Sequence, residues 1–326
     1  MYDVITVGSA TVDVFANTKY SELIKIRTTE REIDLLAYPS GSKILIKELR
    51  FTTGGGGTNT AVALSRLGHK TGYIGKLGSD ENSEFVLKKL KAEKIDFLGV
   101  CGKETGGYSV ILDSIEHDRT ILAYKGANDN LRFRDIDLKK LKTKWFYFSA
   151  MLEESFKTLE RLAEYAKNNG IKICFNASTY LAKKGKLFLK NILKRTDILV
   201  LNKEEARYMS GKESIPDIFK SLRDSGVKIV VITDGRNEGY CYDGNYVYSF
   251  VPHKNIKIVE TTGAGDAFAA SFLSGIMKKN DINFALQLAV TNSESVIHHH
   301  GAKEKLLSYK EALKLVKKVK IKRKRI

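Results

Sequence analysis

The chain of 326 residues has only three prolines, three cysteines and one tryptophan. Because no stretch rich in proline and serine divides it, we expect one large folded unit rather than two tethered domains. The cysteines Cys101, Cys174 and Cys241 are odd in number and widely spaced, which argues against a disulfide framework and a structural zinc site. No run reaches the ~18 apolar residues of a membrane helix, and the first residues lack a basic leader. We therefore expect a cytoplasmic protein with no membrane partner.

Acidic residues are in deficit, so the formal net charge is +17. Residues 314–326 carry eight of the Lys and Arg side chains and no acid. Such a run is more often a solvated, frayed extension than a specific site. We interpret residues 1–313 as the folded domain and 314–326 as a basic C-terminal tail. A nucleic-acid partner is not expected, although weak and salt-sensitive attraction to RNA stays open.

Glycine is concentrated at two places, and the first is Glu260-Thr261-Thr262-Gly263-Ala264-Gly265-Asp266, followed by an apolar run to Gly275. Glycines at the start of a helix let backbone N–H groups approach an anion. A carboxylate beside bound phosphate has little use as a ligand, so Asp266 is a candidate general base for a hydroxyl that attacks phosphate. The alternative is that Asp266 caps an ordinary helix and the glycines only form a turn.

The second cluster, Thr53-Gly54-Gly55-Gly56-Gly57-Thr58-Asn59, leads into a helical pattern that ends at Gly68. Its glycines form either a hinge or a backbone surface for a polar ligand, and Asn59 offers both a donor and an acceptor to a sugar hydroxyl. The alternative is a flexible turn with Asn59 as a helix cap.

Together the two clusters resemble the paired signatures of the ribokinase-like (PfkB) family of carbohydrate and nucleoside kinases, with Glu260 in place of the usual leading Asp. The resemblance extends to about Ser308. It includes the opening strand and turn Val4–Asp13 and, in the family's order, Gly126-Ala127-Asn128, Asn202-Lys203-Glu204-Glu205 and Thr233-Asp234-Gly235.

The fold that both the pattern and the resemblance predict is α/β. Short β-branched runs (71–75, 145–149, 171–175, 197–201 and 229–233) alternate with helical patterns such as 81–93 and 155–169, which indicates a mostly parallel sheet with helices on both faces. Residues 17–50, with an alternating run at 43–49, and 107–125, with strands at 108–113 and 119–124, break this rhythm. We expect them to pair as a small β-sheet lid on a ribokinase-like three-layer α/β/α core.

The resemblance implies ATP and Mg²⁺ as cofactors and assigns a role to each motif. Asp266 is the catalytic base, and the N–H groups of Gly263, Ala264 and Gly265 hold the transferred phosphate. The substrate-binding residues are Asp13, Gly54, Gly55, Gly57, Asn59 and Glu153. The nucleotide-binding residues are Asn202, Glu205, Thr233, Gly235 and Gly239, with Glu205 holding Mg²⁺ through water. Glu260 and Thr262 are candidates for a monovalent cation such as K⁺. Local physics alone would equally explain Asn202 and Glu205 as a helix cap.

These features predict a carbohydrate kinase that phosphorylates a hydroxymethyl group of a small ribose- or fructose-like sugar. The partners are then a sugar or nucleoside and ATP, and a homodimer through the lid is an open expectation. A nucleoside kinase of the same family is the alternative, and a silent RNA-binding protein that uses the basic tail is a remote one. For His298-His299-His300 we favour a surface or nucleotide-edge segment over a metal site, because three successive side chains cannot face one way.

Overall fold

The computed structural model describes residues 1–18, 21–28, 32–113, 119–253, 256, 258–299, 301–316 and 319–325. Ten of the described strands form one sheet in the order β18-β17-β16-β15-β14-β13-β12-β1-β6-β8. From β8 to β15 all neighbours are parallel, and β15 to β18 are antiparallel. The strands are β1 (Tyr2–Val7), β6 (Thr71–Ile74), β8 (Asp96–Phe97), β12 (Thr143–Phe148), β13 (Lys172–Phe175), β14 (Ile198–Asn202), β15 (Ile229–Thr233), β16 (Gly239–Tyr242), β17 (Tyr246–Phe250) and β18 (Ile321–Arg325).

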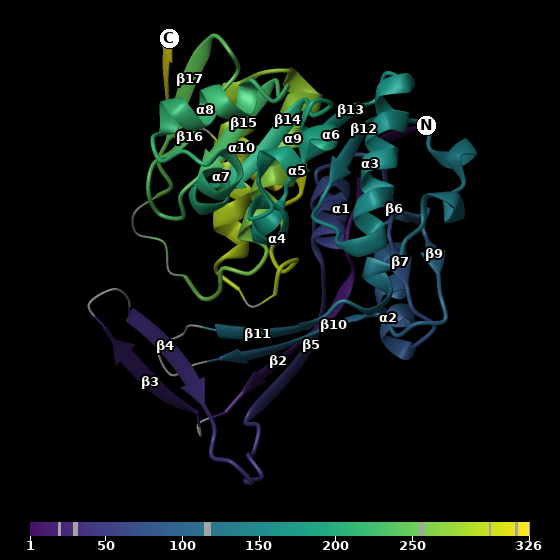
Figure 1. Cartoon of the computed structure of the whole chain (residues 1–326), viewed down its shortest axis with the longest axis vertical. Helices are drawn as coiled ribbons and strands as arrows, with labels where there is room; N and C mark the ends of the chain where they lie inside the picture. Colours follow the sequence, from purple (N-terminus) through teal and green to yellow (C-terminus); the bar gives the residue numbers. More distant parts are fainter. Residues whose placement is uncertain are drawn as a thin grey trace.

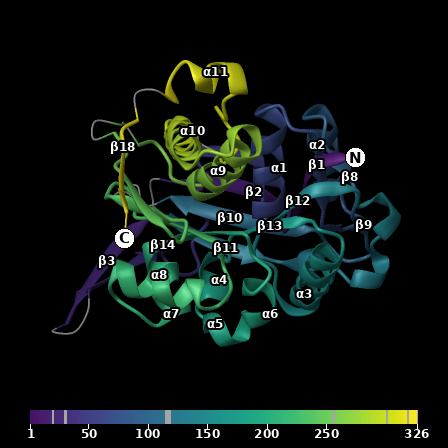
Figure 2. The same cartoon turned by 90° about the horizontal axis from the view of Figure 1, so that it is seen from above.

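Helices cover both faces of this sheet (Figures 1 and 2). The central strands are apolar on both sides, because alternate side chains enter different cores. In β12, Tyr147 joins the core under one helical layer, and Phe146 and Phe148 join the other. The first layer contains α1 (Gly56–Arg66), α2 (Glu81–Ala92), α9 (Ala264–Lys279) and α10 (Ile282–Val296), with α11 (Tyr309–Leu313) packed on α10. The second contains α3 (Glu153–Asn168), α4 (Ser178–Ala182), α5 (Gly185–Phe188), α6 (Lys190–Leu193), α7 (Lys203–Ser210) and α8 (Ile215–Arg223).

A separate four-stranded sheet forms the lid, in the order β11-β10-β2-β5. Its strands are β2 (Thr11–Asn17), β5 (Glu48–Gly54), β10 (Gly107–Asp113) and β11 (Arg119–Tyr124). In Figure 1 the lid lies below the layered core, and the hairpin of β3 (Glu22–Arg27) and β4 (Glu32–Ala37) extends beside it. The two insertions contribute strands to one small sheet, but they do not pair directly as predicted, because β2, which precedes the first insertion, lies between β5 and β10.

Two short strands and three 3₁₀ helices lie outside these two sheets and the helical layers. The strands β7 (Lys76–Leu77) and β9 (Val100–Cys101) pair beside α2. Short 3₁₀ helices occupy Gly126–Asp129, Phe133–Asp135 and Leu138–Lys140. In the first of them, Asn128 is buried and exchanges two hydrogen bonds with the backbone of Ala10, so the Gly126-Ala127-Asn128 motif holds the connection between β1 and β2.

The lid boundaries differ from those predicted. The lid sheet begins at Thr11, so Asp13 lies within strand β2 and not in a turn after β1. The alternating run at 43–49 is a strand only from Glu48 onward, and β5 then continues to Gly54. The reason is the partner strand, because Asn17 pairs with Glu48 and the ladder runs from there back to Thr11 and Gly54. The segment 114–118, predicted to connect two lid strands, lies outside the described residues.

The interpretation of residues 314–326 as a solvated, frayed extension is wrong. Val316 and Val319 are buried, and β18 adds an antiparallel edge strand to the main sheet beside β17. The guanidinium of Arg323 lies 3.6 Å from the centre of the Tyr246 ring, so a cation packs where the pattern suggested only solvent. Among the described residues, no helix combines the length and the apolar character that crossing a bilayer requires.

Candidate active site

The two glycine clusters meet at one hydrogen bond. The Asn59 side chain, in the first turns of α1, donates from Nδ2 to Oδ2 of Asp266 in α9 at 2.9 Å. Asn59 is 5% exposed, and its Oδ1 has no hydrogen-bond partner among the described residues. A buried amide oxygen of this kind favours a donor from outside the protein, such as a hydroxyl group.

Asp13, on lid strand β2, lies near Asp266 as well. Its Oδ1 accepts a hydrogen bond from the Thr11 hydroxyl at 2.8 Å, and the residue is only 6% exposed. Gly54, at the end of β5, passes so close that a Cβ there would lie 1.9 Å from Oδ2 of Asp13. The glycine therefore leaves the space that the carboxylate occupies.

Two further glycines of this cluster, Gly55 and Gly57, pack against backbone atoms and do not form a loose hinge. Gly55 has φ of +90°, and a Cβ there would lie 2.4 Å from the carbonyl oxygen of Ser9. A Cβ on Gly57 would contact the backbone of Gly8 at 2.7 Å. The Gly57 N–H also donates to the Ser9 carbonyl at 3.1 Å. These close contacts with the protein's own backbone argue against the hinge, while the backbone surface for a polar ligand stays a prediction.

Asp266 has the electrostatics of a group that can take up a proton near neutral pH. Burial raises the pKa of its carboxyl to about 6, and the Asn59 amide and Lys303 oppose that rise. Glu205 and Asp13 contribute in the same direction as burial, because each is a second negative charge. A carboxylate with a pKa close to the working pH can accept a hydroxyl proton and later release it.

Helix α9 begins directly in front of Asp266. Its N-cap is Gly263, whose φ of +79° is a left-handed conformation, and a Cβ there would lie 2.5 Å from the side chain of Ala302. The Ala264 N–H donates to the Thr261 carbonyl at 3.2 Å. Gly265 is exposed and has open space where a Cβ would stand, so its backbone is accessible at the helix start.

A cleft of about 1500 Å³ lies beside this helix start. One wall follows the carboxyl ends of β14 and β15, and another follows α9 and α10. Leu23 and Leu36 of the β3–β4 hairpin and Thr120 of lid strand β11 complete the lining. Of the predicted site residues, the lining includes Asn202, Thr233, Gly235, Glu260, Ala264 and Gly265. This is the position where open α/β sheets bind ligands. The cleft is large enough for a nucleotide.

Asn202 and Glu205 form a capping box at the start of α7, so the helix-cap alternative is present in the structure. The Asn202 side chain accepts from the Glu205 N–H, and the Glu205 carboxylate accepts from the Asn202 N–H, at 2.8 and 2.9 Å. Burial raises the pKa of Glu205. The carboxylate also accepts from Thr179 at 3.3 Å, which still leaves lone pairs for a water molecule. The donor set therefore fits a hard cation held through water.

Lys203 and Asp234, each inside one of the predicted nucleotide-binding motifs, form an ion pair. Lys203 Nζ lies 2.8 Å from Oδ2 of Asp234, and both residues line the cleft. Asp234 is thus a carboxylate on the cleft lining whose charge is paired with that of Lys203.

Two predicted site residues lie away from these clusters. Gly239 is in β16, where a Cβ would meet the ring of Phe250 at 2.4 Å, so it makes room for packing. Glu153 is exposed at the first residue of α3 with φ of +49°. Among the described residues, no hydrogen bond joins Glu153 to Asp13 or Asn59. His298 and His299 are exposed, in agreement with a surface segment, and His300 lies outside the described residues.

Glu260 links the helix start to a later segment of the chain. It is 8% exposed, and its Oε2 accepts a hydrogen bond from the Gly301 N–H at 2.8 Å. The hydroxyl of Thr262 is buried and has no hydrogen-bond partner among the described residues. Oxygen atoms of this kind are suitable ligands for a hard cation.

Sequence reasoning missed Lys303, whose ammonium group donates hydrogen bonds to Thr53 and Thr58 where β5 leads into α1. It also missed Tyr147, which is fully buried; burial raises the pKa of its phenol, and the negative charge of Asp266 adds to that rise. Tyr147 lies in a run that predicted only a strand, and Lys303 belongs to no local pattern, so the sequence did not mark either as a site residue.

Comparison with known proteins decides the family. The model of the pfkB family of carbohydrate kinases matches residues 15–308, which is most of the chain. The chain belongs to the pfkB family. It is 28% identical over 309 residues to a ribokinase of Staphylococcus aureus, covering 92% of this chain and 94% of the relative. It is 29% identical over 276 residues to a cytidine kinase of Thermococcus kodakarensis, covering 82% of this chain and 94% of the relative.

The fold of this pfkB protein matches that of solved ribokinase-family structures. The structure of Arabidopsis thaliana ribokinase complexed with ribose and ATP superposes with a TM-score of 0.80 at 20% identity, covering 97% of this chain and 99% of the other. The expected ribokinase-like α/β fold and kinase family are therefore confirmed. Members of this family are phosphotransferases that use ATP and a hydroxyl acceptor, and this chain is such an enzyme.

Proposed function

We propose that this enzyme transfers the γ-phosphoryl group of ATP to a hydroxymethyl group of a small ribose- or fructose-like sugar. The observation that carries the proposal is the bond from Asn59 to Asp266, which places the candidate base beside a buried amide oxygen that lacks a partner. Asp13 supplies a second buried acceptor for ring hydroxyls. A primary hydroxyl on a short arm can reach Asp266 with little crowding.

In this proposal Asp266 takes the proton of the attacking hydroxyl. The Gly265 N–H, at the exposed start of α9, is the main contributor to the anion site, with Gly263 and Ala264 beside it. The Ala264 N–H already serves a turn, so its part is smaller than the sequence suggested. The nucleotide lies in the cleft along Asn202, Thr233 and Gly235. Glu205 would hold Mg²⁺ through water, and the ion supplies neutralisation of phosphate charge when bound.

We assign Glu260 and Thr262 to a monovalent cation site. The support is the buried Thr262 hydroxyl without a described partner next to the buried Glu260 carboxylate. The test is turnover in K⁺ against turnover in tetramethylammonium at equal ionic strength. An equal rate in both would reject the site.

A nucleoside kinase is the second candidate. Leu23 and Leu36 of the β3–β4 hairpin line the cleft, and such apolar lid surface suits a base. The cytidine kinase relative supports the same class. The deciding experiment is a panel of free sugars, sugar phosphates and nucleosides with ATP and Mg²⁺, followed by mass spectrometry of the products. A phosphorylated pentose or hexose supports the first candidate, and a nucleoside monophosphate supports the second.

We propose a second copy of this chain as the partner of the lid. Phe51, Val14, Val110 and Leu122 are neighbours in register across the four lid strands, on the face opposite to Asp13. At the two edge strands of this row, Phe51 and Leu122 are 55% and 56% exposed, whereas Val14 between them is 5% exposed. The pairing of two such faces would bury them symmetrically.

The lid proposal is tested by molar mass from light scattering on wild type and Phe51→Glu. A dimer that the variant converts into a monomer supports it. Leu187→Glu is the control, because Leu187 is 80% exposed on α5, far along the chain from the lid, and should leave the mass unchanged. A wild-type monomer at working concentration would reject the partner.

A further inference from the structure

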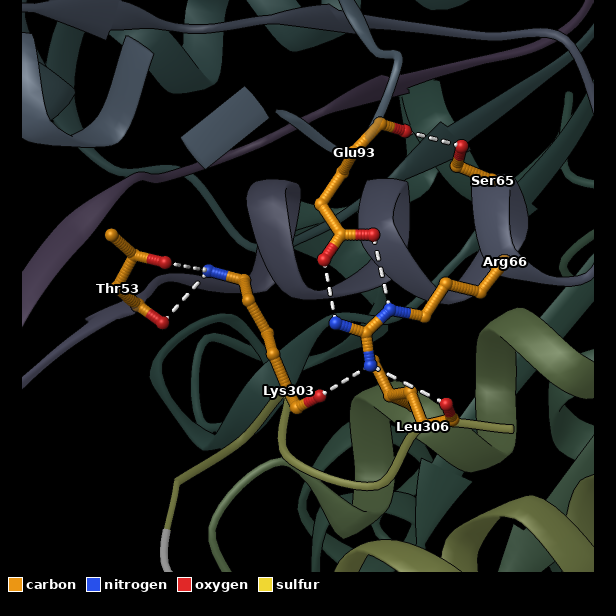
Figure 3. A network of polar contacts seen from close by, with 6 residues as sticks. All are labelled: Thr53, Ser65, Arg66, Glu93, Lys303 and Leu306. Carbon is orange, nitrogen blue, oxygen red and sulfur yellow. Dashed lines mark hydrogen bonds and ion pairs between the residues drawn. The ribbon is translucent and has the colours of Figure 1, made fainter. Parts of the chain in front are cut away.

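The ammonium group of Lys303 bonds to Thr53 of lid strand β5 (Figure 3) and to Thr58 of α1, so it joins three parts of the chain. Its Nζ donates to the Thr53 carbonyl at 2.8 Å, to the Thr53 hydroxyl at 3.0 Å and to the Thr58 hydroxyl at 2.8 Å. Thr53 lies near the end of lid strand β5, and Thr58 lies in the first turn of α1. The lysine therefore spans the junction at which the lid enters the core.

The backbone around Lys303 is itself fixed to α1 and α2. Arg66, the last residue of α1, donates to the Lys303 carbonyl at 2.9 Å and pairs with the carboxylate of Glu93 at the end of α2 (Figure 3). Two residues before the lysine, the Gly301 N–H donates to Glu260. These contacts fix the backbone position of Lys303, in contrast to a lysine in a flexible surface segment.

The charge of Lys303 faces the two carboxylates of the candidate site. Burial lowers the pKa of its ammonium group to about 7, while Asp13 and Asp266 favour the charged form. Glu93 also favours it, and Arg66 opposes it. Seen from Asp266, Lys303 is the nearby cation that offsets burial and the negative charges of Glu205 and Asp13.

We propose that Lys303 is a positioning residue for phosphoryl transfer: it fixes the junction of β5 and α1, and it supplies the half-buried positive charge that balances Asp13 and Asp266. This inference rests on the roles given above to those two carboxylates. Lys303 does not act on phosphate, because its three N–H bonds are already donated to Thr53 and Thr58. It acts through Asp266 by charge and through Asn59 by holding the start of α1.

Three variants separate these two actions. Lys303→Arg keeps the charge, Lys303→Gln keeps donors for the threonine oxygens but removes the charge, and Lys303→Met removes both. The readouts are the pH profile of kcat/KM, the KM of the acceptor, and a carbon NMR titration of the Asp carboxyl groups in which Asp266→Asn assigns the Asp266 signal.

Loss of a neighbouring cation should raise the pKa of a carboxyl, so the acid limb of the profile should move upward by about one pH unit in both neutral variants. The acceptor KM should rise about tenfold in Lys303→Met, which corresponds to about 1.4 kcal/mol, and much less in Lys303→Gln. Lys303→Arg should keep the acid limb of the wild type.

An unchanged acid limb and an unchanged Asp266 titration in Lys303→Gln would overturn the proposal, and this variant decides the matter even if Lys303→Met fails to fold. If the wild type phosphorylates no acceptor on the panel, the proposed function fails. The NMR titration, which needs no turnover, then still tests Lys303 separately.

Discussion

Asn59 and Asp266 are 207 residues apart in the chain and are joined by a hydrogen bond of 2.9 Å between an amide and a carboxylate. Asn59 comes from the helix that follows lid strand β5, and Asp266 comes from the helix that borders the cleft. The bond fixes the orientation of the candidate base toward the acceptor side. It also gives the site a geometry that single substitutions can test.

Asp266→Asn should lower kcat by about 10²–10⁴-fold, since the amide keeps the shape but cannot accept the proton. ATP binding should be little changed. The measurements are kcat from a coupled assay and the Kd of ATP from calorimetry. A variant with kcat near that of the wild type would exclude Asp266 as the base.

The activity of the wild type should depend on pH through Asp266. Because the pKa of this carboxyl is raised to about 6, the base is ionised above that pH and is protonated, hence inactive, below it. We expect log kcat/KM to fall by about one for each pH unit below about 6 and to be level just above it. A level profile down to pH 4.5, with the fold intact by circular dichroism, would contradict the assignment.

Asp13→Ala should raise the KM of the acceptor far more than that of ATP, because this buried carboxylate lies on the lid side of the site and is absent from the lining of the nucleotide cleft. Thr11→Val is the matched control, since it removes only the hydroxyl that bonds to Asp13. Equal increases in both KM values for Asp13→Ala would place the residue elsewhere in the mechanism.

Gly54→Ala and Gly265→Ala form a second matched pair. A methyl group at Gly54 would lie 1.9 Å from Oδ2 of Asp13, so we expect acceptor binding to be lost or the KM to rise by more than about tenfold. At Gly265 a methyl group meets no described atom within 4 Å, so the fold should tolerate it. Thermal melts and acceptor KM values check both. A Gly54→Ala enzyme with the KM of the wild type would show that Asp13 does not contact the acceptor.

Deletion of residues 319–326 should destabilise the protein by at least about 2 kcal/mol, because it removes the buried Val319 and uncovers β17. Urea unfolding measures the loss. The control is Lys322→Gln with Lys324→Gln, which keeps the strand and should change stability by no more than about 0.5 kcal/mol. A deletion as stable as the wild type would mean that β18 does not pair in solution.

Local patterns were sufficient to predict much of this protein. The alternation of β-branched runs and helical patterns gave the central strands to within one or two residues, and the glycine clusters led to Asn59 and Asp266. Both signals are short in sequence, so they can be read without the fold. The order of the motifs supported the family resemblance, and the family match then confirmed the family.

The features that could not be predicted depend on contacts between distant residues. Lys303 bonds to Thr53 across 250 residues, and nothing near it in sequence marks it as buried. The strand β18 is rich in Lys and Arg, which strands disfavour as a rule, and it exists because β17 offers a ladder of backbone partners. The start of β5 was misplaced for the same reason, since its partner β2 sets the register.

The charge of β18 has a consequence for how the protein behaves when concentrated. β18 ends the main sheet, and an open strand edge of this kind can join the edge of another molecule and start aggregation. Here the exposed side chains along it are Lys322, Arg323, Lys324 and Arg325. Two such edges repel each other before their backbones can meet. The basic side chains of β18 thus oppose edge-to-edge association of two molecules, and high salt should weaken this repulsion.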